Sequence, residues 1–474
     1  MRGIVGKSFG PQLAVEYGMA FGTFLREANP SEDRSRVCIG RDSRPSGAML
    51  AAAVSAGLMA VGCETVDLGI VTTPGVGLMT RFLSCTGGVV ITASHNPVEW
   101  NGVKLLRNDG IAFPSDQARS IRQIYYDRQF AAGDSLSVGG ASTDARSHAV
   151  HVDTVLQLCD KTLISSKRFK IVLDSINGAG CVVTANLLSK LGCEYIHINN
   201  RPTGIFAHTP EPTAENLSEL GPIIKQHSAH IGFAQDPDAD RLAVIDENGC
   251  YIGEEYTLAL AAKYIFGKKK GAAAVNLSTS RMIDDLAAEA GCTVIRTPVG
   301  EANVAQAAQA NNCVIAGEGN GGVIDLRVVP VRDSLVGIVL ILQLMAETDK
   351  TVSQLVDEIP RYHIVKTKFP CPQERVNAIL NTVEQHYRAT KADDVKIDIS
   401  DGIRVDLSEG WVQLRASNTE PIMRIMAESA NAAEAQKLID QIKMLVKKRE
   451  EKKNPESRIQ NPEERREKNS PNDE

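Results

Sequence analysis

Four short polar stretches carry the residue types that could do chemistry. The first is TASHNP, which places Ser94, His95 and Asn96 directly after the apolar run 87–91. Serine and asparagine at a strand end are often only turn formers, because their side chains bond their own backbone. The alternative is that the strand end delivers the serine, the histidine and the asparagine to one functional site. These six residues alone leave both interpretations open.

The second stretch, DPDADR, brings three carboxylates to one extended loop. Asp236, Asp238 and Asp240 alternate along it, and their oxygens suit a hard cation such as Mg²⁺. The spacing also mimics an EF-hand loop that ends at Glu247, but Arg241 stands where that turn needs glycine, and the flanking runs are strand-like. Calcium is therefore disfavoured. A solvated acidic turn is disfavoured too, because three anions between buried strands repel each other without a cation.

The third stretch, GEGNGG, matches the G-x-G-x-x-G spacing of dinucleotide-binding turns. That fingerprint must open a helix, whereas the run VIDLRVVPV that follows is typical of a strand. A dinucleotide site is therefore rejected. Glu318 and Asn320 on this glycine-rich loop are better interpreted as readers of hydroxyl groups on a polar ligand.

The fourth stretch, RASNTEP, offers a guanidinium, hydroxyls, an amide and successive backbone N–H groups. Such a set suits a phosphate dianion, although Ser-Asn-Thr is also common turn chemistry. The candidate phosphate ligands are Arg415, Ser417, Asn418, Thr419 and, beyond the stretch, Arg424.

The elements that must position these loops repeat one pattern three times. Short apolar runs alternate with longer helical segments over 36–94, 170–236 and 272–319, which is typical of βαβ units with parallel strands. After about residue 369, a hairpin, a further strand and an amphipathic helix predict an antiparallel α+β domain. We therefore expect three similar mixed α/β domains with mainly parallel sheets around a cleft, followed by one α+β domain. The expected ranges are 1–150, 151–253, 254–366 and 367–446.

Composition excludes several classes of function. A net charge of -6 with 23% charged residues favours no nucleic-acid or membrane partner. The ten cysteines stand singly, which favours reduced thiols and a cytoplasmic location. No signal peptide is visible, and the apolar run 335–346 is too short to span a bilayer, so it predicts a core helix. Residues 447–474 are almost all charged or polar and predict a disordered tail.

All four polar stretches follow strand-like runs, and α/β domains bind ligands at the carboxyl ends of their strands. Four domains could thus surround one cleft with a serine, a metal loop, a hydroxyl-reading loop and a phosphate cradle. Together these parts predict phosphoryl transfer to a polyhydroxy substrate that already carries a phosphate.

With these motifs in this order, the chain resembles the α-D-phosphohexomutase superfamily over nearly its whole length before the tail. TASHNP resembles the family's phosphoserine loop, DPDADR its magnesium loop, GEGNGG its sugar-binding loop and RASNTEP its phosphate-binding loop. The resemblance implies a phosphorylated Ser94, one Mg²⁺ held by Ser94 and the three aspartates, and Arg2, Arg41 and Lys104 in the cleft. GEGNGG lacks the Ser-Gly-His ending of many bacterial relatives and, with RDSLVG after it, resembles a branch usually assigned as phosphoglucosamine mutase.

This family's reaction interconverts hexose 6-phosphate and hexose 1-phosphate through a hexose 1,6-bisphosphate. Glucosamine phosphate is favoured here, with phosphomannomutase or phosphoglucomutase activity as the alternative. Lys104 and Arg241 would add positive charge near the moving group, and Lys104 and His95 are candidates for proton transfer. An aspartyl-phosphate phosphatase would leave TASHNP unexplained, and a non-catalytic sensor would be expected to lose Ser94 or an aspartate. We expect a monomer or dimer.

Overall fold

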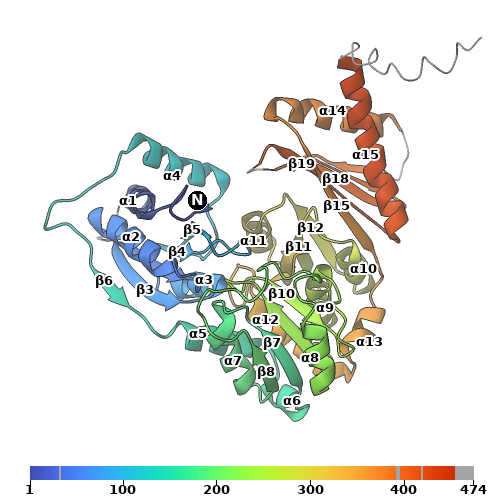
Figure 1. Ribbon diagram of the computed structural model, residues 1–474, viewed down its shortest axis with the longest axis horizontal. Coiled ribbons are helices and arrows are strands. Elements are labelled where there is room, and N and C mark those ends of the chain that lie inside the picture. The colour runs from blue at the N-terminus through green and yellow to red at the C-terminus, as the bar shows by residue number, and fades with distance from the viewer. Residues whose placement is uncertain (31–33, 391–394, 418–419, 454–474) are drawn as a thin grey trace, which may run out of the picture. The chain divides into compact units, whose positions relative to one another are not determined.

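Two compact units make up the chain. The computed structural model describes residues 1–30, 34–390, 395–417 and 420–453. The first unit spans Met1–Pro360, and the second begins at Arg361. Figure 1 shows three α/β sheets in the first unit and one sheet in the second. The predicted fold class, three mixed α/β domains followed by an α+β domain, is confirmed.

The first sheet has the strand order β1-β5-β4-β2-β3-β6, in which β5 runs antiparallel to both of its neighbours and the other pairs are parallel. Its elements are β1 Arg2–Ile4, α1 Pro11–Ala28, β2 Arg36–Arg41, α2 Gly47–Ala60, β3 Glu64–Ile70, α3 Thr73–Phe82, β4 Gly87–Ile91, β5 Trp100–Arg107, α4 Ser115–Asp127 and β6 Ala141–Thr143. Successive residues of β2 face opposite layers. Ile39 packs in the core formed with α1 and α2, and Cys38 packs in the core formed with α3.

The second and third sheets are smaller versions of this plan. The second has the order β10-β9-β7-β8 and the third the order β12-β11-β13-β14, each with one antiparallel edge strand. The second domain contains α5 Ser147–Val155, α6 Lys161–Ser166, β7 Lys170–Asp174, α7 Gly180–Lys190, β8 Glu194–Ile198, α8 Leu220–His227, β9 Ile231–Gln235 and β10 Leu242–Ile245. The third contains α9 Glu254–Lys268, β11 Ala272–Asn276, α10 Met282–Glu289, β12 Thr293–Thr297, α11 Glu301–Ala310, β13 Ile315–Glu318, β14 Gly322–Ile324, α12 Ser334–Thr348 and α13 Val352–Asp357.

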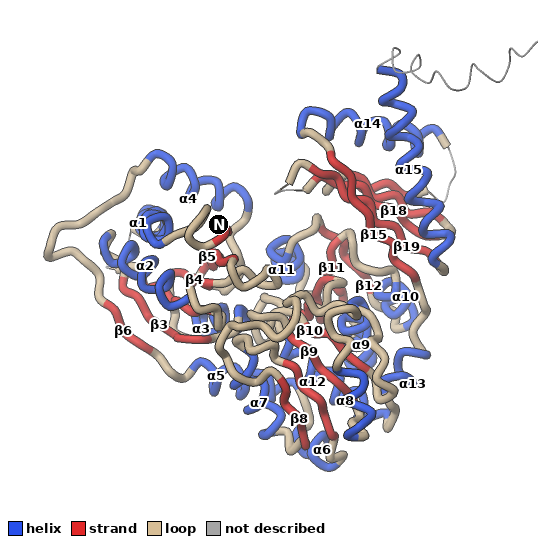
Figure 2. Tube along the Cα trace, viewed as in Figure 1, coloured by secondary structure: helices blue, strands red, loops and turns tan. Residues whose placement is uncertain are grey.

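The second unit is an antiparallel sheet of order β15-β19-β18-β17-β16 that packs on two helices (Figure 2). Its elements are β15 His363–Pro370, α14 Gln373–Ala389, β16 Lys396–Asp398, β17 Ile403–Leu407, β18 Gly410–Ala416, β19 Ile422–Ser429 and α15 Ala432–Lys453. Strand β15 pairs with β19 along its whole length, and this compact unit begins at Arg361, whereas the predicted domain range 367–446 stays a prediction. Helix α15 continues to Lys453, past the predicted start of the tail at 447, and the rest of that predicted tail lies outside the described residues.

The same strand–loop–strand turn occurs in all three domains of the first unit and positions the three polar loops. In each domain a parallel strand ends, a short loop follows, and the chain returns as an antiparallel strand: β4 to β5, β9 to β10, and β13 to β14. Each loop contains a residue with positive φ, namely Ser94 (51°), Ala239 (53°) and Gly321 (84°). The predicted strand-end positions of TASHNP, DPDADR and GEGNGG follow from this repeated turn.

The long apolar run 335–346 forms the middle of helix α12, which is buried on all sides as predicted for a core helix. In the part of the chain that the structure describes, no helix combines the length and the apolar character needed to cross a bilayer.

Candidate active site

Ser94 lies just beyond the end of strand β4. Its backbone N–H donates to Thr92 Oγ1 over 2.9 Å, and this tight turn points the side chain toward the second domain. There, Ser94 Oγ donates to Asp236 Oδ2 over 3.2 Å. Ser94 is only 3% exposed. The serine loop (residues 92–100) therefore presents a shielded hydroxyl directly to the acidic loop.

Arg44 is buried beside the serine loop and holds its backbone in place. Its guanidinium donates at 2.5–3.0 Å to four backbone carbonyls, those of Ser94, Asn96, Pro97 and Trp100. Asp42 accepts from the same guanidinium at 2.9 Å and from Thr92 Oγ1 at 2.6 Å. Buried carbonyls need donors, so Arg44 is the part of RDSRPSG that shapes this loop.

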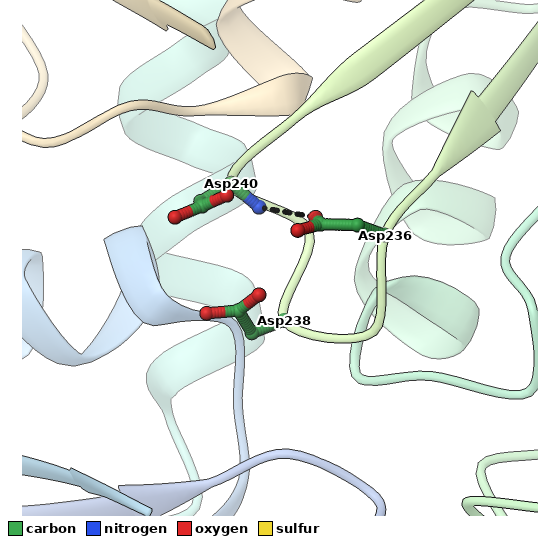
Figure 3. Close-up of side chains that lie close together, drawn as sticks. All are labelled: Asp236, Asp238 and Asp240. Carbon is green, nitrogen blue, oxygen red and sulfur yellow. Dashed lines mark hydrogen bonds between the residues drawn. The ribbon is translucent and has the colours of Figure 1, made fainter. Parts of the chain in front are cut away.

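Asp236, Asp238 and Asp240 converge on one point at the end of the second sheet (Figure 3). One ligand oxygen from each lies within 4.8 Å of the others, and all three residues are fully buried. The loop is a tight turn rather than the extended loop that the alternating aspartates predict. The reason is that Asp236 Oδ1 accepts from the backbone N–H groups of both Asp240 and Arg241, each at 3.1 Å.

The donor set of the triad fits a hard divalent cation. Asp238 Oδ2 accepts from Thr73 Oγ1 at 2.6 Å and from Lys104 Nζ at 3.0 Å. Asp240 Oδ2 accepts from Arg332 Nη2 at 2.6 Å. The second oxygens, Asp238 Oδ1 and Asp240 Oδ1, are buried and have no hydrogen-bond partner among the described residues. Since buried carboxylate oxygens rarely stay unsatisfied, these atoms are suited to hold an oxygen-preferring ion.

The surroundings of the triad shift the pKa values of its groups in different directions. Burial, followed by the carboxylates of Asp240 and Asp238, raises the pKa of Asp236 well above its usual value. Burial also works to raise the pKa of Asp238, but Lys104 and the hydrogen bond from Thr73 outweigh it and lower that pKa. For Lys104, the opposing effect of burial is outweighed by Asp238 and Asp240, so its pKa is raised. Lys104 is therefore a fixed cation of the site.

Arg332 is a site residue that the sequence pattern does not single out. Its guanidinium lies 2.6 Å from Glu318 Oε2, 2.6 Å from Asp240 Oδ2 and 3.6 Å from Glu301 Oε1. Burial works to lower its pKa, but Asp240, Glu301 and Glu318 raise it well above the usual value. Arg332 thus links the metal loop to the sugar loop. The only signal for it in the sequence is its place in the RDSLVG motif.

The two predicted sugar-reading residues begin the loop from β13 to β14. Glu318 is 4% exposed, and its Oε1 accepts from Asn276 Nδ2 at 2.7 Å while its Oε2 accepts from Arg332. Each carboxylate oxygen has a second lone pair, so Glu318 can still accept a hydrogen bond from a ligand. Asn320 Oδ1 is buried and has no partner within the described part of the chain. Glu318 is thus held in place, and both residues keep acceptor capacity.

Three more predicted residues lie near Ser94. His95 Nδ1 is 3.4 Å from Ser94 Oγ, and burial, followed by Arg241 and Arg2, lowers the pKa of His95 to about 4. Arg2 donates to the side chain of Asn96 at 2.7 Å, which ties the first strand to the serine loop. His95 is thus uncharged near neutral pH, and the positive charge beside Ser94 comes from arginines.

Arg41 is not brought to this site. It lines a separate cavity of about 310 Å³ together with Asp67, Thr65 and Ser142. Successive residues near a strand end point to opposite faces of the sheet, and Asp42 takes the face toward the serine loop. The placement therefore gives no support to the predicted cleft role of Arg41.

The candidate phosphate loop belongs to the second unit. Arg415 on β18 and Arg424 on β19 lie directly opposite each other in the sheet. Asp401 Oδ2 is 3.1 Å from Arg415 Nε, and Glu420 Oε2 is 3.7 Å from Arg424 Nη2. Like charges at opposed positions destabilise a sheet, so a bound anion would be favourable there. The other predicted ligands are Ser417, at the end of β18, and Asn418 and Thr419, which lie outside the described residues.

Families of phosphoglucomutase/phosphomannomutase domains match most of the chain. The α/β/α domains I, II and III match residues 1–132, 149–249 and 253–362, and the C-terminal domain matches 367–444. The phosphoglucomutase/phosphomannomutase of Thermococcus kodakarensis is 36% identical over 93% of this chain and 95% of its own length. The chain belongs to the α-D-phosphohexomutase superfamily.

Other relatives of this phosphohexomutase carry a second name. The probable phosphoglucosamine mutases of Methanopyrus kandleri and Methanococcoides burtonii are each 37% identical, over 94% and 92% of this chain and 96% and 95% of their own lengths. The crystal structure of a phosphoglucomutase/phosphomannomutase family protein from Burkholderia thailandensis matches with a TM-score of 0.83 and 26% identity, over 94% of this chain and 95% of that one. The predicted family and mutase activity are therefore confirmed: the protein is an isomerase of the phosphohexomutase type.

Proposed function

We propose that this phosphohexomutase interconverts glucosamine 6-phosphate and glucosamine 1-phosphate. The choice of sugar rests on the hydrogen-bond acceptors of the sugar loop. Asn320 Oδ1 has no hydrogen-bond partner among the described residues, and it lies close in the chain to the Glu318 carboxylate. Acceptors suit the protonated amine at C2 of glucosamine. The names of the two relatives at 37% identity support the same choice. The relative at 36% identity supports the alternative, phosphoglucomutase/phosphomannomutase activity, because a C2 hydroxyl can also donate.

Ser94 is the residue to which we assign the phosphoryl group. A free serine hydroxyl is a poor nucleophile, so a phosphoserine formed in advance is the reactive state. Its phosphoryl group would pass to a sugar hydroxyl and give a hexose 1,6-bisphosphate. After the sugar reorients, Ser94 Oγ would take back the other phosphoryl group. The hydrogen bond between Ser94 Oγ and Asp236 supports this assignment, since it brings the serine to the acidic triad.

A magnesium ion is the cofactor that we propose for the triad, with Asp236, Asp238, Asp240 and the phosphate on Ser94 as ligands. Its chemistry there would be to neutralise charge on the phosphoryl oxygens. In addition, the side chains of Lys104 and Arg241 supply fixed positive charge.

Proton transfer is assigned to His95 rather than to Lys104. The ammonium of Lys104 is engaged by the carboxylates of Asp238 and Asp240, at 3.0 and 3.6 Å, and has no reason to release or take a proton. The ring of His95 has a nitrogen 3.4 Å from Ser94 Oγ. The imidazole is neutral at that position and can accept a proton from a sugar hydroxyl, as a weak base because its pKa is lowered.

In the second unit, Arg415 and Arg424 are the side chains that we assign to the phosphate that is not transferred. Their opposed positions on β18 and β19 form a pair that a dianion would neutralise.

The free thiols of all ten cysteines support a reducing compartment, and we propose the cytoplasm as the location.

Replacing Asp238 by asparagine should weaken the binding of a divalent cation by more than about tenfold. The substitution removes one of the anionic ligands and leaves Lys104 facing a neutral amide. Mn²⁺ titrations followed by electron paramagnetic resonance measure this directly, without turnover.

The matched control is Asp246→Asn. Asp246 is also buried, but its Oδ1 accepts from the backbone N–H groups of Asn248 and Cys250, a role that an amide oxygen keeps. Equal Mn²⁺ affinity in Asp238→Asn and Asp246→Asn would remove the triad as the cation site.

Two sugar-loop variants test the choice of substrate with glucosamine, mannose and glucose phosphates. Glu318→Gln should lower kcat/KM by roughly ten- to a hundredfold on every sugar, because one charged hydrogen bond is worth about 1.5–3 kcal/mol. Asn320→Ala should instead change the ratio between the sugars. We expect the wild-type protein to prefer glucosamine phosphate, with measurable turnover of the other two.

The same panel can contradict the proposal in two ways. An equal loss on all sugars in Asn320→Ala would exclude Asn320 as the selecting residue. A wild-type protein that is inert toward glucosamine phosphate and fast on mannose phosphate would overturn the proposed substrate and leave the phosphohexomutase activity in place.

A further inference from the structure

Two cysteines of the first domain lie in contact, far apart in sequence and unused by the proposed mechanism. The sulfur atoms of Cys38 and Cys85 are 3.2 Å apart, although 47 positions separate the residues along the chain. Cys38 lies in the middle of strand β2, and Cys85 lies in the turn between α3 and β4. Both are buried, with exposures of 0% and 2%. The fold thus builds a preformed dithiol into the core between α3 and the sheet.

We propose that Cys38 and Cys85 form a reversible disulfide when the protein meets a peroxide. The two sulfurs need to approach by about 1.1 Å to reach the S–S bond length of roughly 2.05 Å. One equivalent of hydrogen peroxide takes two electrons from the pair. The Cys85 thiolate attacks the peroxide to give a sulfenic acid and hydroxide. The Cys38 thiol then displaces water from that sulfenic acid, so that two thiols and one peroxide give one disulfide and two waters.

The contacts of the pair support Cys85 as the sulfur that reacts first. Cys85 follows Ser84, which is exposed at the end of the α3–β4 turn, whereas Cys38 is enclosed within β2. The hydrogen bond between the two thiols lowers the pKa of Cys85, and the same bond, followed by burial, raises the pKa of Cys38. A thiolate at the edge of the core with a second thiol behind it is the arrangement of a reacting and a resolving cysteine.

The disulfide would stabilise the first domain and leave the candidate active site unchanged. It would join β2 to the α3–β4 turn and close a loop of 47 residues, which restricts the unfolded chain. Helix α3 meets the metal loop at its other end, where Thr73 contacts Asp238. Strand β4 likewise leads away from Cys85 toward Ser94. Because the sulfurs lie at the opposite ends of both elements, we expect turnover to be unchanged.

The test is peroxide oxidation of the full-length protein, followed by alkylation of the remaining thiols and peptide mapping without reduction. We expect one linked peptide pair containing Cys38 and Cys85, an intact mass lower by two hydrogens before alkylation, and a thermal midpoint raised by roughly 5 °C or more. Dithiothreitol should reverse all three changes, and kcat/KM should stay within about twofold.

Cys85→Ser and Cys38→Ala should each abolish both the linked peptide and the rise in the midpoint, while Cys250→Ser, at an exposed cysteine, should keep both. The use of two different variants guards against a failure of one to fold. Recovery of Cys38 and Cys85 in alkylated form after peroxide treatment would overturn the proposal. So would oxidation that stops at a sulfinic acid on Cys85 with Cys38 still a thiol.

Discussion

Ser94→Ala should lower the turnover of hexose phosphate by at least about a thousandfold while the protein still folds. The variant removes the oxygen to which we assign the phosphoryl group, and no other hydroxyl is assigned that role in the proposed reaction. Folding should survive because alanine keeps the Cβ and loses only two long contacts of Ser94 Oγ, with Asp236 and with His95. The measurements are kcat/KM with glucosamine 6-phosphate and the free energy of unfolding in denaturant.

The matched control for this variant is Ser84→Ala. Ser84 has a φ of 50°, nearly the same as the 51° of Ser94, so the backbone cost of alanine in the left-handed region is shared by both. Ser84 lies in the α3–β4 turn and should keep full activity. A Ser94→Ala protein that retained wild-type turnover would contradict the assigned role of the serine.

Arg332→Met should cost about 3–5 kcal/mol of stability and most of the activity. Methionine removes the cation that contacts Asp240, Glu318 and Glu301, and buried carboxylates that lose a partner are strongly destabilising. The metal loop and the sugar loop would also lose their shared anchor, so kcat should fall and the KM for the sugar phosphate should rise together. Denaturant unfolding and steady-state kinetics measure the two effects.

Arg327→Met is the matched control on the same segment. Arg327 pairs with Asp325 alone among the described ion pairs; the Arg327 side chain is 55% exposed, whereas that of Asp325 is 1% exposed. Because the Arg327 end of this single pair is open to solvent, the variant should lose less stability than Arg332→Met and should remain active. If Arg332→Met were no less stable than Arg327→Met, the bridging role of Arg332 would be wrong.

The sequence predicts the fold and the loops well because both depend on local patterns. Alternation of short apolar runs with helical segments identifies the three α/β domains, and TASHNP, DPDADR and GEGNGG are recognisable because each interrupts an apolar run. The structure brings Ser94 close to the three aspartates, as expected for polar loops that follow neighbouring strands, and Lys104, which the family resemblance implies for the cleft, contacts Asp238 and Asp240. Residues of this kind are visible in the sequence because their type and spacing carry the chemistry.

Other parts of the site depend on packing between domains and cannot be read from spacing. Arg332 belongs to the third domain and reaches Asp240 of the second, and Thr73 belongs to the first and reaches Asp238. Nothing in the residues around either one indicates its partner. The cleft role of Arg41 stays a prediction. Its motif suggests a cleft residue, but the alternation of β2 turns its neighbour Asp42 toward the serine loop instead.

The most direct test of the proposed mechanism is to follow the phosphate on Ser94 through a single turnover. Phosphorylated protein is mixed with a slight excess of glucosamine 6-phosphate and quenched at short times, and the Ser94 peptide and the sugar phosphates are analysed by mass spectrometry. We predict that phosphate leaves Ser94 at the rate at which glucosamine 1,6-bisphosphate forms, and that it returns as glucosamine 1-phosphate appears. Formation of glucosamine 1-phosphate while the phosphate on Ser94 stays in place, or on a protein that carries none, would contradict the mechanism.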